Sequence, residues 1–223
     1  MSEAIARRPR TERTRAALVA AGRRLFSERP VDAVSIDDIV QTADVAKGSF
    51  YNHFPDREEL VRAISAEIRG CVERGIDCAN AGVDDPARRV ARACCTYLRF
   101  ALDDPERARV LVRVQSGHTS LTSPLNRGLV DDISNGLSSG RFRVATLESG
   151  VLYVLGVTQM ALVRIVKEPS PTLAINLAQQ MCAMLLSGLR VPDVEADLIA
   201  AQASDDIVRG GACADAFKPE RVS

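Results

Sequence analysis

Hydrophobic residues recur along most of the chain at the three- and four-residue spacing of an α-helix. Residues 11–27 show the pattern first, because Ala17, Leu18, Ala21 and Leu25 fall on one helical face. No stretch has the two-residue alternation of a half-buried strand. The pattern predicts an all-α protein with nine or ten helices, at residues 11–27, 36–43, 46–54, 56–76, 86–102, 105–115, 125–134, 146–167, 172–189 and 192–202.

Turn-forming residues divide this series of helices. The segment "NAGVDDP" ends at Pro86, a residue suited to a first helical position. We expect the first domain to cover residues 8–65 and a larger helical bundle to cover residues 66–203. The remainder, residues 204–223, contains two adjacent glycines and is expected to be a mobile tail.

Charge is balanced over the whole chain but not along it. The 223 residues carry 29 basic and 29 acidic side chains, so the net charge indicates no partner. Residues 1–24, in contrast, contain seven arginines against Glu3 and Glu12. A basic end suggests an anionic partner there, with a solvated arm as the alternative.

The six cysteines do not have metal-site spacing. None forms a C-x-x-C pair and neither histidine lies near them in sequence, so we expect no metal and no cofactor. We expect the thiols to be reduced and the protein to be cytoplasmic. The most apolar run, 151–166, is interrupted by Thr158, Gln159 and Arg164 and is expected to be a buried helix rather than a membrane span.

One short segment departs from ordinary helix composition. Residues 46–54 place Lys47 in a first turn that disfavours cations, and Gly48 in a helix interior, where it costs about 1 kcal/mol relative to alanine. The preceding helix starts at Ser35, with Asp38 three residues later as a capping box. Apolar residues of both segments can form one small core and leave the polar ones outside. This layout predicts a helix-turn-helix whose second helix enters the major groove of DNA.

The stretch "SIDDIVQTADVAKGSFYNHFPDREEL" resembles the DNA-binding segment of the TetR/AcrR family of bacterial transcriptional regulators. The resemblance covers roughly residues 10–65. Two positions depart from the family pattern: Asp44 stands where the turn usually has glycine, and Ala46 where serine or threonine is usual. Aspartate tolerates the left-handed backbone of such a turn. The matching residues are Lys47, Gly48, Ser49, Phe50, Tyr51, His53, Phe54, Arg57 and Leu60.

The resemblance implies roles for individual residues at a double-stranded DNA operator. Phosphate contacts position such a protein, whereas contacts to base edges select the sequence. Each residue also has a local alternative: Tyr51 as part of the core, His53 as a packing residue and Ser35 as a helix cap. The implied phosphate contacts are Ser35, Lys47, Tyr51 and His53, the implied base contacts Gly48, Ser49 and Asn52, and Arg57 would hold the DNA backbone.

The resemblance also implies that the second domain binds a small-molecule effector and forms a homodimer through the helices at 146–167 and 172–189. A dimer suits a palindromic operator with half-sites about 34–36 Å apart. Each candidate effector contact could equally be an ordinary core or surface residue. The candidates are Tyr97, Phe100, Gln115, His118, Tyr153 and Met160.

Together these features predict a sequence-specific DNA-binding regulator, a repressor that a small molecule releases from its operator. Two alternatives stay open: a regulator controlled by a protein partner or by no ligand, and a non-specific architectural DNA-binding protein. An enzyme is disfavoured, because Cys94 and His118 could act as nucleophile and base but no third catalytic residue is evident.

Overall fold

The computed structural model describes residues 10–114 and 120–217, and within these ranges the chain forms ten α-helices and no strand. It divides into two compact units, Met1–Glu67 and Ile68–Ser223. The division falls inside one helix, two residues after the predicted boundary at 65. The all-α fold class predicted from the sequence is confirmed.

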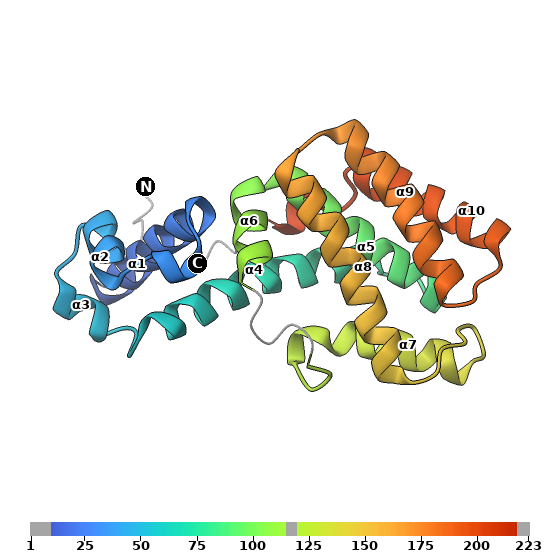
Figure 1. Ribbon diagram of the computed structural model, residues 1–223, viewed down its shortest axis with the longest axis horizontal. Helices are drawn as coiled ribbons and strands as arrows, with labels where there is room; N and C mark the ends of the chain where they lie inside the picture. The colour runs from blue at the N-terminus through green and yellow to red at the C-terminus, as the bar shows by residue number, and fades with distance from the viewer. Residues whose placement is uncertain (1–9, 115–119, 218–223) are drawn as a thin grey trace, which may run out of the picture. The chain divides into compact units, whose positions relative to one another are not determined.

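The first unit contains α1 (Arg10–Glu28), a short 3-10 turn (Val31–Ala33), α2 (Ile36–Ala43), α3 (Lys47–Tyr51) and the start of α4 (Arg57–Ala79) (Figure 1). Helix α1 packs against both α2 and α3. Leu18 and Phe26 from α1, Ile39 from α2 and Phe50 from α3 have no exposed surface. A five-residue helix is too short to be stable alone, so α3 depends on this core.

Local signals fix the geometry between α2 and α3. The Ser35 hydroxyl accepts a hydrogen bond from the Asp38 amide at 3.1 Å, and the Asp38 carboxylate accepts one from the Ser35 amide at 2.9 Å. The helix ends at Asp44, which adopts a left-handed conformation with φ 53°. The capping box and the tolerance of aspartate at this turn are therefore confirmed.

The second unit is built around α5 (Pro86–Asp103), which packs against α7 (Arg127–Ser138), α8 (Leu147–Lys167), α9 (Pro171–Gly188) and α10 (Asp193–Ala203). The shorter α6 (Pro105–Arg113) contacts α5 and α8. Figure 1 shows α9 and α10 side by side. Pro86 and Pro105 each occupy the first turn of their helix, as their sequence position predicts.

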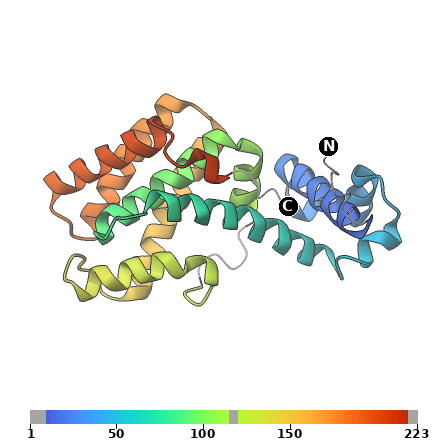
Figure 2. The ribbon, with the colours of Figure 1, turned by 180° about the vertical axis from the view of Figure 1, so that it is seen from behind.

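Two expectations about the second unit need correction. Helix α7 continues to Ser138, because Gly136 gives room for the Phe142 ring, which a methyl group at position 136 would overlap. The tail expected from residue 204 is folded over 204–217 into a π-helical turn (Ser204–Arg209) and a 3-10 turn (Ala214–Phe217). Figure 2 shows this C-terminal segment lying along α5.

The C-terminal segment is also covalently attached. A disulfide joins Cys78 of α4 to Cys213, so the expectation that all thiols are reduced is wrong. Phe217 is buried against the Phe100 ring, with 5.4 Å between ring centroids, and its carbonyl accepts a hydrogen bond from Arg107 at 2.8 Å. The sequence could not reveal the pairing, because 135 residues separate the two cysteines.

Helix α8 is long and apolar enough, by length and composition alone, to cross a membrane. The core helix of a soluble protein passes the same test. Seven residues of α8 are buried within the second unit, among them Val151, Val154 and Leu162. The helix is therefore partly buried: Leu152, Tyr153 and Met160 on its other side are exposed.

Candidate DNA-binding surface and internal cavity

Helix α3 presents a polar surface over an apolar base. Phe50 and Phe54 are buried and their ring centroids lie 5.8 Å apart. Lys47, Gly48 and Asn52 are exposed, and Tyr51 is 53% exposed with its ring edge against Phe50. Ser49 and His53 are half-buried. Six of the eight residues that the sequence assigns to DNA thus share one short helix and its C-terminal turn, whereas Ser35 precedes α2 and Arg57 starts α4.

The start of α3 is narrow and carries a cation. Among the described residues, no atom outside the helix backbone and the two adjacent residues lies within 4 Å of the position that a Cβ would take at Gly48, so this part of the helix is open to a close approach. The Lys47 ammonium forms an ion pair with Asp37 of α2 at 2.8 Å, and this hydrogen bond raises the pKa of Lys47. Both side chains are solvent-exposed, so the lysine can exchange this partner for a phosphate at little cost.

Two of the proposed DNA contacts also have structural roles. Ser35 caps α2, as described above. The Arg57 guanidinium donates hydrogen bonds to the carbonyls of Val31 (3.3 Å) and Val34 (3.1 Å), and it forms ion pairs with Asp32 and Glu58. Arg57 therefore holds the loop before α2 onto α4, which positions the helix-turn-helix indirectly.

The second unit contains a cavity of about 400 Å³. Its walls come from α4, α5, α7 and α8, with smaller contributions from Leu111 of α6 and from Asn126. Most of the lining is apolar. The polar lining residues are Arg69, Glu73, Asp77, Arg89, Cys94, Tyr97, Asn126, Asp132, Thr158 and Gln159.

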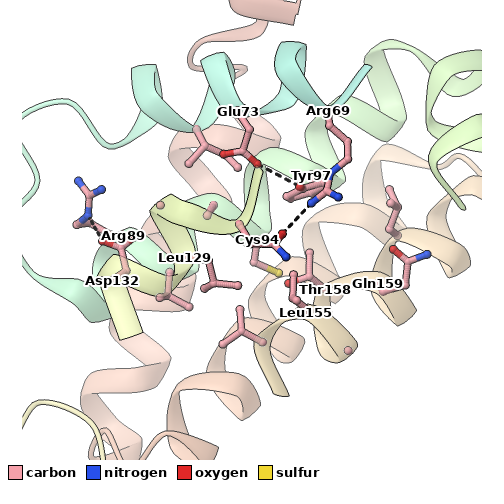
Figure 3. A pocket seen from close by; sticks show the side chains of 18 of the residues that line it. Arg69, Glu73, Arg89, Cys94, Tyr97, Leu129, Asp132, Leu155, Thr158 and Gln159 are labelled. Carbon is pink, nitrogen blue, oxygen red and sulfur yellow. Dashed lines mark hydrogen bonds and ion pairs between the residues drawn. The ribbon is translucent and has the colours of Figure 1, made fainter. Parts of the chain in front are cut away.

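Five of these polar residues form two separate groups. Figure 3 shows Arg69 and Glu73 pointing from α4 to the part of the cavity where Tyr97 lies, whereas the ion pair between Arg89 and Asp132 lies to one side. The Tyr97 hydroxyl donates a long hydrogen bond, 3.5 Å, to the Glu73 carboxyl group. Burial raises the pKa of Glu73 to about 7, with a further increase from Asp77 and an opposing effect of Arg69.

Only some of the six candidate effector contacts lie at the cavity. Tyr97 and Met160 line the cavity. Phe100 packs against Phe217 on another face of α5, and the Tyr153 hydroxyl donates a hydrogen bond to the Met184 carbonyl of α9 at 3.1 Å. Gln115 and His118 lie outside the described residues.

The sequence reading missed the charged wall of the cavity. Arg69, Glu73 and Asp77 follow one another at four-residue intervals on α4, so they occupy one face of that helix. A charged row on a helix that is expected to pack into a bundle is a usable signal.

The unpaired cysteines of the described residues belong to the core. Cys94 and Cys182 are buried, and the Cys95 and Cys182 sulfurs lie 3.8 Å apart. A hydrogen bond with Cys182, together with burial, holds the pKa of Cys94 well above its usual value, which keeps the thiol protonated and unreactive. No group of three acidic, histidine or cysteine side chains in the described residues could hold a metal ion.

A helix-turn-helix in one unit and a ligand-sized cavity in another define a DNA-binding transcription regulator. A sequence profile of bacterial regulatory proteins of the tetR family matches residues 18–64, and a profile of the tetracyclin repressor-like C-terminal domain matches residues 85–202. The second match covers more than half of the chain. The chain therefore belongs to the TetR family, whose members are DNA-binding transcription regulators and often ligand-responsive repressors.

Solved structures agree with this assignment. RolR in complex with resorcinol is 30% identical, with 88% of this chain and 97% of RolR covered and a TM-score of 0.64. FadR from Bacillus subtilis, in complex with stearoyl-CoA, is 16% identical, with 78% and 98% covered and a TM-score of 0.63. A gamma-butyrolactone receptor is 20% identical, with 88% and 100% covered and a TM-score of 0.59. The last two similarities show the fold alone.

Proposed function

We propose that this protein is a cytoplasmic homodimeric repressor that binds a palindromic operator and leaves it when a small molecule enters the cavity of the second unit. The observation that carries the proposal is the pairing of an exposed polar recognition helix, α3, with a cavity of about 400 Å³ elsewhere in the same chain. A ligand changes operator affinity if it binds one of two conformations better than the other.

The proposed contacts to DNA follow the exposure of α3. Lys47, Tyr51 and His53 bind phosphates, with Ser35 at the start of α2, and Arg57 supports the backbone contacts. Gly48, Ser49 and Asn52 approach base edges, because Gly48 leaves the leading end of the helix thin. The neutral net charge favours sequence selection over non-specific architectural binding, which depends chiefly on positive charge.

A dimer is supported by apolar side chains that the isolated chain leaves exposed. Leu152, Tyr153 and Met160 on α8 and Met184 on α9 are all large and exposed. Exposed apolar side chains on neighbouring helices are typical of a protein–protein contact, and α10, which packs against α9, carries two more, Val194 and Leu198. Helices α8 and α9 are therefore the proposed interface.

A small hydroxylated effector is supported by the similarity to RolR, whose structure was solved with resorcinol. The cavity volume lies in the range of small-molecule sites. Resorcinol is accordingly the first probe for release of the operator.

The test is a titration of the purified protein on its own upstream DNA at two salt concentrations. We expect tight binding to that DNA and weak binding to a scrambled sequence. Lys47→Ala should weaken binding and reduce the salt dependence by about one counterion, whereas Lys167→Ala, the same change on α8, should not. Tyr51→Phe should also weaken binding if its hydroxyl contacts phosphate.

Three outcomes separate the alternatives. Equal affinity for scrambled DNA would support the architectural reading. Tight, selective binding that no small molecule relieves would support control by a protein partner or by no ligand. Wild-type operator binding by both the Lys47→Ala and Tyr51→Phe variants would remove α3 as the recognition helix.

A further inference from the structure

Some polar groups of the cavity wall are already hydrogen-bonded to protein partners, and others have unused hydrogen-bonding capacity. Both arginines in its wall are already bound: Arg69 donates to the Asn126 side chain at 2.8 Å, and Arg89 pairs with Asp132 and donates to the Val83 carbonyl at 3.2 Å. Asn126 is bound in turn, since its amide donates to the Ser120 carbonyl at 2.9 Å. These bonds hold the walls of the cavity together and use one or two of the five N–H donors of each guanidinium.

The Glu73 carboxyl group, in contrast, is largely free of hydrogen-bond partners within the described residues. Within the described part of the chain, the one hydrogen bond to its carboxyl group comes from the Tyr97 hydroxyl, at a distance of 3.5 Å. An ionised carboxylate has four lone-pair sites, so most of its accepting capacity is unused. The buried phenol of Tyr97 remains neutral, because burial raises its pKa further above the usual value. Glu73 and Tyr97 are thus polar groups that a ligand can engage, and Asp77, Thr158 and Gln159 also line the cavity.

We propose that Glu73 and Tyr97 form the specificity anchor of the cavity and that they select a small neutral molecule with at least one hydroxyl donor. The ligand hydroxyl donates to the Glu73 carboxylate, and the body of the ligand lies against apolar wall residues such as Val90, Leu129 and Leu155. This inference rests on the proposed function and assigns the chemistry of its effector.

Charge around the cavity disfavours an anionic ligand. An anion would meet the carboxylates of Glu73, Asp77 and Asp132, while both guanidiniums are occupied by partners of their own. A cation would be attracted by Glu73 and Asp77 but would also meet the Arg69 guanidinium. Burying an uncompensated charge is costly, whereas a hydroxyl gains a charge-assisted hydrogen bond.

The anchor also predicts how binding depends on pH. The groups that act on Glu73 are Arg69 and Asp77 on α4 and Tyr97 on α5. A hydroxyl donor binds the ionised carboxylate, and Glu73, with a pKa of about 7, passes from mostly protonated at pH 6 to mostly ionised at pH 8. Affinity should therefore rise by up to about tenfold over that interval and level off above it.

Isothermal titration of the full-length protein at pH 6, 7 and 8 tests the anchor with three probes: resorcinol, 1,3-dimethoxybenzene, which has no donor, and 3-hydroxybenzoate, which is anionic. We expect resorcinol to bind at least about tenfold more tightly than either other probe at pH 8. Glu73→Gln should weaken resorcinol binding about tenfold at pH 8, leave it nearly unchanged at pH 6, and so abolish the pH dependence.

The control is Asp77→Asn, which removes a carboxylate one turn further along the same wall. It should keep the pH dependence, shifted to lower pH, because Asp77 raises the pKa of Glu73. Tyr97→Phe should weaken resorcinol binding at every pH. Thermal unfolding and operator binding of each variant would reveal any general loss of folding.

The inference would be overturned if Glu73→Gln kept the wild-type affinity and pH profile, if 3-hydroxybenzoate bound as tightly as resorcinol, or if no hydroxylated probe bound at millimolar concentration. Failure of this inference does not imply failure of the proposed function. The proposed function is judged by selective operator binding and by release with any ligand, neither of which requires Glu73.

Discussion

The two units of this protein arrange their polar side chains in opposite ways. In the first unit, α3 turns Lys47, Tyr51 and Asn52 toward solvent over an apolar base. In the second unit, Glu73 and Tyr97 face an interior cavity. An outward surface needs one helix and its turn, whereas an inward site needs several helices to meet. Changes confined to one unit should therefore affect DNA binding and ligand binding separately.

The variant expected to separate DNA binding from ligand binding most clearly is Phe50→Ala. Phe50 has no exposed surface, and truncation of a buried phenylalanine costs about 3–5 kcal/mol. The first unit should unfold and operator binding should be lost, while titration of the second unit with resorcinol should be unchanged. Gln41→Ala, an exposed change on α2, serves as the control. Joint loss of both activities would show that the two units fold as one.

The disulfide gives the next largest effect and acts on the second unit. Reduction, or Cys213→Ser, should lower the free energy of unfolding of that unit by about 2–4 kcal/mol, because the bond closes a loop whose ends are 135 residues apart. Chemical denaturation with and without reductant measures the change. A Cys78→Ser, Cys213→Ser double variant should show no response to reductant.

Thiol counting on the unreduced, denatured protein provides an independent check, with four free thiols expected from the six cysteines. Six free thiols would contradict the bond. Disulfides are rare in cytosolic proteins, so the state of Cys78 and Cys213 in growing cells also tests the proposed compartment.

The smallest expected changes in stability come from removing two helix caps that have the same hydrogen-bonding pattern. Ser35 caps α2 in the first unit and Thr146 caps α8 in the second, each within a reciprocal capping box. Ser35→Ala and Thr146→Ala should each cost about 0.5–2 kcal/mol, the first in the DNA-binding unit and the second in the cavity unit. Ser35→Thr and Thr146→Ser keep the hydroxyl acceptor and should cost less. If each alanine variant lowered the stability of both units equally, the two units would not be independent in stability.

The sequence predicted the first unit in more detail than the second. Ser35, Asp44, Gly48 and Phe50 act over a few residues, so their spacing alone specifies the cap, the turn and the exposed face of α3. Helix order and the prolines that start α5 and α6 were predictable for the same reason.

The cavity could not be predicted in this way, because its polar anchor joins residues 24 positions apart on α4 and α5. The C-terminal disulfide joins residues still further apart. Helix α7 extends past its predicted end at residue 134 because Gly136 accommodates the ring of Phe142, which lies beyond the helix end. Each of these features depends on tertiary packing, which local periodicity does not encode.

The scarcity of aromatic residues has a spectroscopic consequence. The chain contains no tryptophan and three tyrosines, so its intrinsic near-ultraviolet fluorescence comes from tyrosine alone. Tyr51 lies on the recognition helix, Tyr97 lines the cavity and Tyr153 lies on α8 at the proposed subunit contact. Tyrosine emission would therefore respond to operator binding, ligand entry and association without any added label.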